Sequence, residues 1–280
     1  MVDTKPEGIK RRRGSLLPRH ELRELAVASG HPPKLLDLVH VTAVGRGIDI
    51  VRAKKIETQR CPVFEHDLVY TFVGRPAYRF RNGHIKSDEI GYFPFVFVIS
   101  PDKLGIPYHV YPFDTGAGVE GRYADAADRY VFLEDYELAP ELSAAQWHIA
   151  WEFGSNAAYY DGDPKPGLID QVPHFKMVVR ACLKIASLAA TGSNRPDKRA
   201  SAIEVAYGSH IQLKDHVRLV ILPQQFLEDG GERNTAFITE LHVLGLKWET
   251  YNWRPNETPD AYMDEIARIV RRYFESTGQL

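Results

Sequence analysis

The chain contains two kinds of apolar pattern: short runs of apolar residues, often β-branched or aromatic, and longer segments in which apolar residues recur every three or four positions. The first kind predicts strands and the second predicts amphipathic helices. Predicted strands lie at 35–42, 68–73, 92–100, 108–113, 202–207, 217–222 and 241–251. Predicted helices lie at 18–29, 43–53, 142–153, 173–190, from 224 to 227 onward and 260–274. Because the strands and helices do not follow a regular βαβ order, the pattern predicts an α+β fold.

A central strand, a loop and a tail define the expected domain organisation. The run at 92–100 is almost continuously apolar, which predicts a central strand buried on both faces. The glycine-rich segment 114–125 predicts a loop. Residues 1–17 are polar and charged, which predicts a flexible basic tail. The rest of the chain, 18–280, then forms a single domain, with a helical and loop insertion around 120–172.

Composition and charge narrow the class of protein. With 44% hydrophobic and 26% charged residues, the 280-residue chain lies in the globular range and can bury a full core. The formal net charge of -2 argues against a surface that is positive throughout. It leaves the basic run Lys10–Arg13 as a solvated tail or as a contact for nucleic acid or an acidic partner. No apolar run has the length of a signal peptide or a membrane helix, so we expect a cytoplasmic protein without membrane contact.

The two cysteines, Cys61 and Cys182, are far apart in the sequence and form no C-x-x-C pair. This spacing argues against a disulfide framework and against a structural zinc site. The histidines are scattered, and no two of them have a good metal-binding spacing. We therefore expect no metal.

Polar side chains interrupt two of the predicted strands. His40 and Thr42 lie on the first strand, Tyr70 lies on the second, and Arg75 follows the second directly. Polar groups on two neighbouring strands can line a ligand cleft. Three of them also have a structural interpretation. His40 could be a core histidine bonded to a carbonyl, Thr42 the N-cap of helix 43–53, and Tyr70 a packed tyrosine. Their occurrence in order on separate strands favours a shared site.

A single carboxylate, Glu204, stands between Ile203 and Val205 in the strand predicted at 202–207. Alternation along an edge strand would point it at solvent, whereas an acid inside an apolar strand suits acid–base chemistry. Walker, H-E-x-x-H and G-x-S-x-G motifs are absent from the sequence. The glycines of 116–121 match G-x-G-x-x-G, but they lack the strand–loop–helix context that nucleotide binding requires.

Three of these motifs together resemble the ADP-ribosyltransferase fold: His-x-Thr on the first strand, the Asp-led strand at 67–73 running into Gly-Arg-Pro, and Arg-x-x-x-x-Glu-Val at 199–205. They are most similar to the DarT-like branch, which modifies nucleobases in DNA. The resemblance covers residues 36–100 and 195–223, and the segment 120–172 has no counterpart. It implies a split antiparallel or mixed sheet with flanking helices, NAD as a substrate, and a nucleic-acid or protein acceptor, with nucleic acid favoured. A toxin or phage-defence role with an antitoxin partner is typical of proteins that resemble this branch.

The resemblance also implies roles for the residues. Cleavage of the nicotinamide–ribose bond builds positive charge on the ribose, which the carboxylate of Glu204 would stabilise. An arginine would bind the pyrophosphate, and Arg60 is the nearest match to the family's pattern. Arg75 and Arg79 are rivals because they follow the second strand directly. We therefore expect Glu204 and Arg60 as catalytic residues, and His40, Thr42, Tyr70 and Arg75 as NAD-binding residues.

Two other functions fit the same residues. An NAD glycohydrolase would use water as the acceptor and nearly the same side chains. A non-catalytic module that binds nucleic acid or protein would use the run Lys10–Arg13 and the cluster Arg75, Arg79 and Arg81 for phosphate contacts. Release of nicotinamide from NAD distinguishes the enzymes from the binding module, and the acceptor itself is not encoded in any motif.

Overall fold

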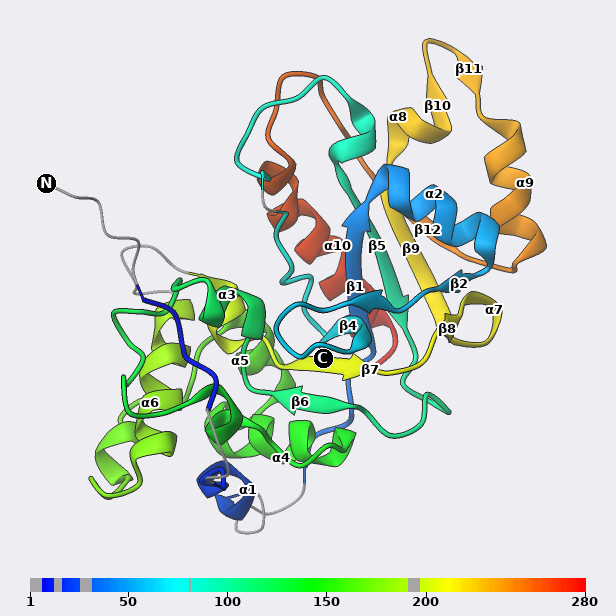
Figure 1. Cartoon of the computed structure of the whole chain (residues 1–280). Coiled ribbons are helices and arrows are strands. Elements are labelled where there is room, and N and C mark those ends of the chain that lie inside the picture. Colours follow the sequence, from blue (N-terminus) through cyan, green and yellow to red (C-terminus); the bar gives the residue numbers. More distant parts are fainter. Residues whose placement is uncertain (1–6, 13–16, 26–31, 81, 191–196) are drawn as a thin grey trace, which may run out of the picture.

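The computed structural model describes residues 7–12, 17–25, 32–80, 82–190 and 197–280. In these parts the chain forms a mixed sheet with flanking helices, which confirms the predicted α+β class (Figure 1). None of their helices combines the length and the apolar character needed to cross a membrane.

An eight-stranded sheet is the largest in the described part of the chain, and seven of its strands form one continuous path. In spatial order the path runs through β12 (Trp248–Tyr251), β9 (Val217–Pro223), β5 (Pro94–Ile99), β1 (Leu38–Ala43), β4 (Asp67–Val73), β7 (Glu204–Tyr207) and β6 (His109–Tyr111). The eighth strand, β3 (Gln59–Arg60), pairs with β4 beside this path. Neighbours are antiparallel except β12 and β9, which are parallel. Two short antiparallel pairs lie outside it: β2 (Lys55–Ile56) with β8 (Ile211–Gln212), and β10 (Glu228–Asp229) with β11 (Glu232–Arg233).

The helices gather at the two ends of this sheet (Figure 1). Beside β6 and β7 lie α1 (Glu21–Leu25), α3 (Thr115–Val119), α4 (Leu142–Glu152), α5 (Asn156–Asp161) and α6 (Met177–Ala186). Around β1, β5, β9 and β12 lie α2 (Val44–Ala53), α8 (Gln224–Leu227), α9 (Thr235–Val243) and α10 (Met263–Ser276). The short α7 (Leu213–His216) precedes β9, and 3₁₀ turns include η3 (Leu133–Tyr136) and η6 (Lys198–Ser201).

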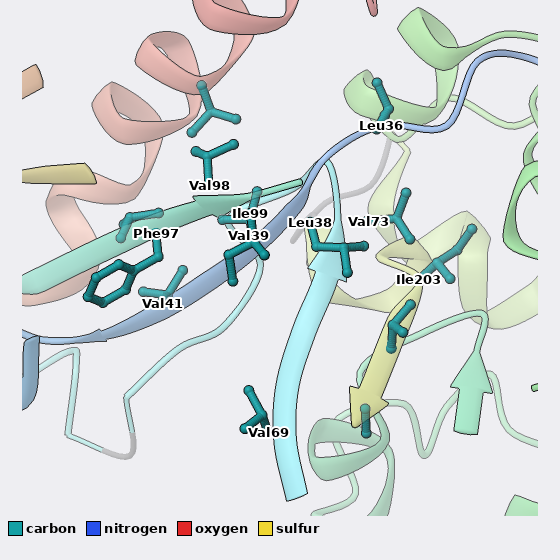
Figure 2. Packing of buried hydrophobic residues seen from close by; sticks show 14 of the residues in the cluster. Leu36, Leu38, Val39, Val41, Val69, Val73, Phe97, Val98, Ile99 and Ile203 are labelled. Carbon is teal, nitrogen blue, oxygen red and sulfur yellow. The ribbon is translucent and has the colours of Figure 1, made fainter. Parts of the chain in front are cut away.

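The core is centred on β5, which is buried at all six of its positions. Its neighbours β1 and β9 pair with it along both edges, and side chains cover both of its faces, so the continuous apolar run predicted this strand correctly. Figure 2 shows the buried residues Val39 and Val41 of β1 and Val98 of β5, which pairs with Val39. Complete burial of one such side chain stabilises the fold by roughly 1.5–3 kcal/mol, so this layer holds the sheet in register.

Two local predictions were wrong, and the bounds of a third were too wide. The loop expected at 114–125 contains α3, because the Asp114 side chain caps it by accepting the N–H of Ala117. The N-cap of α2 is Ala43 and makes no side-chain bond, so Thr42 does not cap this helix. Only the end of the strand expected at 241–251 forms β12, and its start belongs to α9.

The predicted flexible basic tail is described only in part. Its residues 1–6 and 13–16 lie outside the described residues, as do residues 26–31 at the end of the predicted helix 18–29. Residues 7–12 are packed against the domain, with Arg11 and Arg12 in ion pairs with Glu134 and Asp135 of η3. This part of the basic run is therefore neutralised within the chain and is not a free tail.

Gly74 ends β4 in a left-handed conformation, with φ +62°, and donates its N–H to the carbonyl of Asp37 at 2.9 Å. A Cβ at this position would lie 2.5 Å from Cδ1 of Leu36. Left-handed strain costs about 1–2 kcal/mol and crowding a packed core costs about 1–3 kcal/mol, so we expect Gly74→Ala to lower the free energy of unfolding by about 2–5 kcal/mol. Gly167 has φ +69° and no heavy atom within 4 Å of a Cβ, so Gly167→Ala isolates the strain. Equal losses in denaturant unfolding would contradict a tight contact at Leu36.

Candidate active site

The two strands that carry His40 and Tyr70 separate inside the sheet. β1 and β4 pair at only two positions, at the Leu38–Val39 end of β1. From there β1 continues along β5 to Ala43, whereas β4 pairs with β7 and β3. Figure 2 shows the two strands diverging beyond Leu38. The divergence opens the sheet between β1 and β4.

A cavity of about 500 Å³ occupies this opening. Ligand pockets for small molecules and cofactors are typically about 300–1,000 Å³, so the volume suits such a ligand. The walls come from β1, α2, β2, β3, β4 and the segment that follows β4. Polar and aromatic residues among them are His40, Thr42, Arg46, Asp49, Lys55, Glu57, Gln59, Arg60, Cys61, Tyr70, Phe72, Tyr78 and Phe80.

His40 is half-buried on the β1 wall, and its Nδ1 lies 2.8 Å from the carbonyl oxygen of Tyr70. Because a carbonyl only accepts, Nδ1 carries the proton, and Nε2 of a neutral ring is left as an acceptor. Burial lowers the pKa of His40, and the bond to the carbonyl opposes this shift. The ring is therefore neutral at pH 7. Its bond to Tyr70 links β1 to β4 where the two strands separate, and the ring also lines the cavity.

Tyr70 faces His40 from the β4 wall. Its hydroxyl donates to Sγ of Cys61 at 2.8 Å, which fixes the ring along the cavity. Burial raises the pKa of Tyr70, and the charge of Glu204 raises it further, so the phenol stays protonated. Thr42 also lines the cavity, half-buried, and its hydroxyl has no hydrogen-bond partner among the described residues. These two walls offer an aromatic face, a neutral imidazole and a free hydroxyl.

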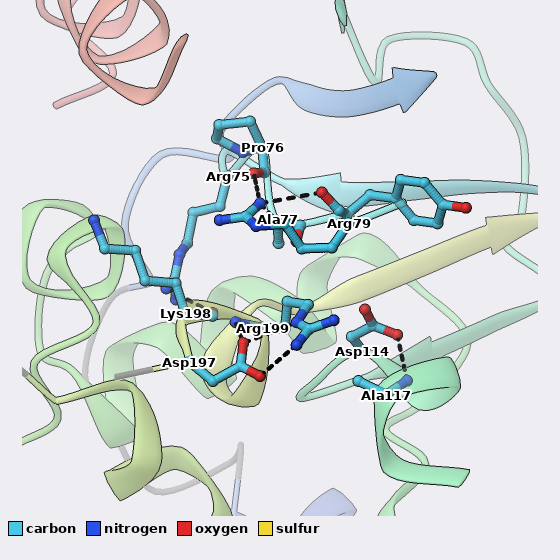
Figure 3. Close-up of polar contacts among 10 residues, drawn as sticks. Arg75, Pro76, Ala77, Arg79, Asp114, Ala117, Asp197, Lys198 and Arg199 are labelled. Atoms are coloured by element: carbon cyan, nitrogen blue, oxygen red, sulfur yellow. Dashed lines mark hydrogen bonds and ion pairs between the residues drawn. The ribbon is translucent and has the colours of Figure 1, made fainter. Parts of the chain in front are cut away.

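Arg75 and Arg79 lie outside the lining of this cavity. The Arg75 side chain is 2% exposed and donates to the carbonyls of Ser201, at 3.0 Å, and Lys198, at 2.7 Å, in η6. Burial lowers the pKa of Arg75. Arg79 turns back and donates to carbonyls of its own segment, 76–78 (Figure 3). Both guanidinium groups are therefore held by hydrogen bonds to backbone carbonyls of the chain.

Two other arginines do line the cavity. Arg60 of β3 is exposed, and its only described partner is Asp67 at 3.8 Å. Arg46, in the first turn of α2, is exposed and forms no ion pair with a described residue. It was missed from the sequence, although its place four residues after Thr42 puts it at the same end of β1. Arg81, which the alternative of a binding module groups with Arg75 and Arg79 for phosphate contacts, lies outside the described residues.

Glu204 begins β7 directly opposite Phe72 of β4. Paired residues of antiparallel strands point to the same face, so Glu204 shares a face with Phe72 and Tyr70. Its carboxylate is 2% exposed and does not point at solvent. It accepts the backbone N–H of Thr115 at 3.1 Å and the Thr115 hydroxyl at 2.7 Å, and it lies 3.1 Å from Nε2 of His109. The carboxylate is thus oriented by three partners that no sequence motif indicated.

A second acid, Asp114, lies beside this network. Burial, followed by the charge of Glu204, raises the pKa of Asp114 to about 7, while the N–H of Ala117 and the charge of Arg199 oppose the shift. Arg199 is itself paired with Asp197, at 2.6 Å between Nη2 and Oδ2 (Figure 3). Two acids with different environments and a histidine therefore meet at the start of α3 and β7, which is an arrangement suited to proton transfer.

The raised pKa of Asp114 predicts a pH dependence of stability. In the folded state Asp114 keeps its proton until about pH 7, whereas an unfolded aspartate loses it near pH 3.9. Native protein then binds the extra proton between these values, so this group lowers stability as the pH rises through them. Asp114→Asn keeps an N-cap oxygen and has no proton to lose. We expect denaturant unfolding to show similar stability near pH 4 and a gain of about 2–4 kcal/mol over wild type at pH 8. Parallel pH profiles would contradict the assignment.

Glu204 does not line the cavity. Phe72, Ala77 and Ala202 form a small apolar cluster, which ties the segment that follows β4 to the residues just before β7. Tyr78 lines the cavity, and the charge of Asp114 adds to burial in raising the pKa of Tyr78. The structure thus brings His40, Thr42, Tyr70 and Arg60 together around one cavity and leaves Glu204 outside its lining.

Comparison with known proteins identifies no relative: no family model, no curated protein and no solved structure matches this chain. The function therefore has to be argued from the residues of the cavity and the acid network.

Proposed function

We propose that this chain is an NAD-dependent ADP-ribosyltransferase that modifies a macromolecular acceptor, with nucleic acid favoured. The supporting observation is the opening between β1 and β4. Its walls carry His40, Thr42 and Tyr70, three of the four residues that the sequence resemblance assigns to NAD, whereas the fourth, Arg75, lies outside the lining. Packing alone does not require three such side chains around one cavity of about 500 Å³.

The chemistry of the walls matches the parts of NAD. The ring of Tyr70 offers a stacking surface to nicotinamide. The neutral imidazole of His40 and the free hydroxyl of Thr42 can bond a ribose or the nicotinamide amide. Arg46 and Arg60 supply exposed guanidinium groups for the pyrophosphate, which arginine binds through charge-assisted bidentate bonds.

In the proposed reaction, nicotinamide leaves with the electron pair of its bond to ribose. The acceptor nucleophile forms the new bond to the same ribose carbon and loses its proton to solvent. Glu204 stabilises the positive charge that develops on the ribose. The bonds from Thr115 hold this carboxylate in a fixed orientation. Glu204 does not line the cavity, so its contact with the ribose requires a rearrangement of the residues between them.

The arginines give a test of NAD binding. The double variant Arg46→Ala, Arg60→Ala loses both exposed guanidinium groups of the cavity, so we expect the KM for NAD to rise about 10–100-fold, which corresponds to about 1.4–2.7 kcal/mol. Folding should be unchanged because both side chains are exposed. Arg233→Ala, an exposed arginine that does not line the cavity, is the control. An unchanged KM would remove these arginines from the proposal.

Incubation with NAD tests the function itself. We expect released nicotinamide and a labelled product when single-stranded DNA, RNA or cell lysate is added. Consumption of NAD without a labelled macromolecule would favour an NAD glycohydrolase. A non-catalytic binding module is the remaining alternative, and the fully satisfied carboxylate of Glu204 is the observation in its favour. It would be supported if no condition consumed NAD.

A further inference from the structure

A second cluster of chemically active side chains lies in the helical layer beside β6, remote from the cavity lining. His148 and Glu152 are one turn apart on α4 and therefore share a face of that helix. Cys182 comes from α6. One ligand atom from each of the three lies within 4.8 Å of the other two. Their exposed fractions are 4%, 1% and 1%, so the cluster is enclosed in the core.

The polar atoms of this cluster are incompletely paired. Nε2 of His148 lies 2.7 Å from Oε2 of Glu152. The second carboxylate oxygen, Oε1, is buried and has no hydrogen-bond partner among the described residues. Cys182 is a free thiol. A buried carboxylate normally has all its oxygens paired with donors or bound to a metal, so the unpartnered Oε1 of Glu152 points to a metal ligand.

We propose that His148, Glu152 and Cys182 bind one zinc ion between α4 and α6. An imidazole nitrogen, a carboxylate oxygen and a thiolate are three of the four donor positions of tetrahedral zinc, and this mixed set of borderline and soft ligands favours zinc over magnesium or calcium. Ligand atoms around tetrahedral zinc are separated by about 3.3–3.8 Å. The three atoms lie within 4.8 Å of one another, and Nε2 of His148 and Oε2 of Glu152 are 2.7 Å apart, so metal binding would draw Cys182 inward and move this pair slightly apart.

The position of the site indicates a structural role. The ion would cross-link α4, which packs against β6, to α6, which packs against η6. β6 carries His109, and η6 leads into Glu204, so the cross-link would brace both sides of the acid network. The sequence did not indicate this site, because Cys182 is far from His148 along the chain and lies beside it only in the folded structure.

Binding must displace a proton. Burial, and then the charge of Glu152, raises the pKa of Cys182, so the thiol is protonated without a metal. Zinc coordinates the thiolate, and the thiol proton leaves to solvent as the zinc–sulfur bond forms. Zinc affinity should therefore fall as the pH falls.

Metal analysis of the purified full chain tests the site, and the chain supplies its own control because it has only two cysteines. After equilibration with zinc and removal of unbound metal, we expect one zinc per chain in wild type and in Cys61→Ala. The isosteric Cys182→Ser variant should retain less than a tenth of that amount. Zinc at wild-type level in Cys182→Ser would overturn the proposal.

Cobalt substitution of the wild-type protein covers the case in which Cys182→Ser does not fold. We expect one Co²⁺ per chain with a thiolate-to-cobalt charge-transfer absorption, the same spectrum in Cys61→Ala, and its loss when zinc is added. Absence of both stoichiometric zinc and this absorption from wild type would overturn the site. Neither measurement involves NAD, so this inference and the proposed function fail independently.

Discussion

Glu204→Gln is expected to abolish NAD turnover while leaving the fold intact. The substitution removes the negative charge that opposes the developing ribose cation, and positioned acid–base or electrostatic groups contribute about 10²–10⁴-fold in rate. The glutamine oxygen can still accept the N–H and hydroxyl of Thr115. We therefore expect a stability loss of about 1 kcal/mol, the usual net effect of altering one hydrogen-bonded contact.

Nicotinamide release and denaturant unfolding, measured on the same preparations, check this expectation. Asp37→Asn is the matched control, because Asp37 is also a buried acid but bonds Tyr273 and Gln279 at the C-terminal helix, away from the cavity. It should retain wild-type turnover. Turnover by Glu204→Gln equal to wild type would remove Glu204 from the mechanism. A stability loss of several kcal/mol would instead show that the carboxylate has a mainly structural role.

Local pattern was sufficient to predict most of the secondary structure. The unbroken apolar run of β5 and the three- and four-residue spacing in α2 depend only on which faces are buried, and that information lies within each segment. α3 was not predicted, because its glycines favour a loop, whereas in the structure the cap by Asp114 stabilises a helix. The strand predicted at 241–251 began too early, because the last apolar residues of α9 were assigned to it although Gly245, with φ +68°, separates α9 from β12.

The site could be predicted only to the level of its walls. His40, Thr42 and Tyr70 were identified because polar residues inside apolar strands are visible in sequence, and the cavity lies where they meet. The partners of Glu204 are 89 and 95 positions away in the chain, so no spacing rule reaches them. The same limit applies to the arginines. Tertiary packing decides that Arg60 lines the cavity whereas Arg75 bonds the carbonyls of η6.

Arg75 shows this limit most clearly, and its removal should be the most destabilising of the arginine substitutions. Besides the carbonyls of Ser201 and Lys198, it donates to Oγ of Ser201 at 2.7 Å, and its guanidinium lies 5.4 Å from the centre of the Tyr159 ring. Arg75→Ala leaves these acceptors buried without a donor and opens a void. Each unsatisfied buried group costs about 1–3 kcal/mol, so we expect a loss of at least about 3 kcal/mol in the free energy of unfolding.

Arg79→Ala is the matched control, since Arg79 is half-buried and bonds only carbonyls of its own segment. It should lose about 1 kcal/mol or less. Denaturant unfolding separates the two variants, and NAD titration of the conservative Arg75→Lys variant separates structure from binding. If Arg75→Lys were as stable as wild type but failed to bind NAD, the guanidinium would belong to the pyrophosphate site. The geometry predicts the reverse, because its donors point into η6 and hold the turn that places Glu204 at the start of β7.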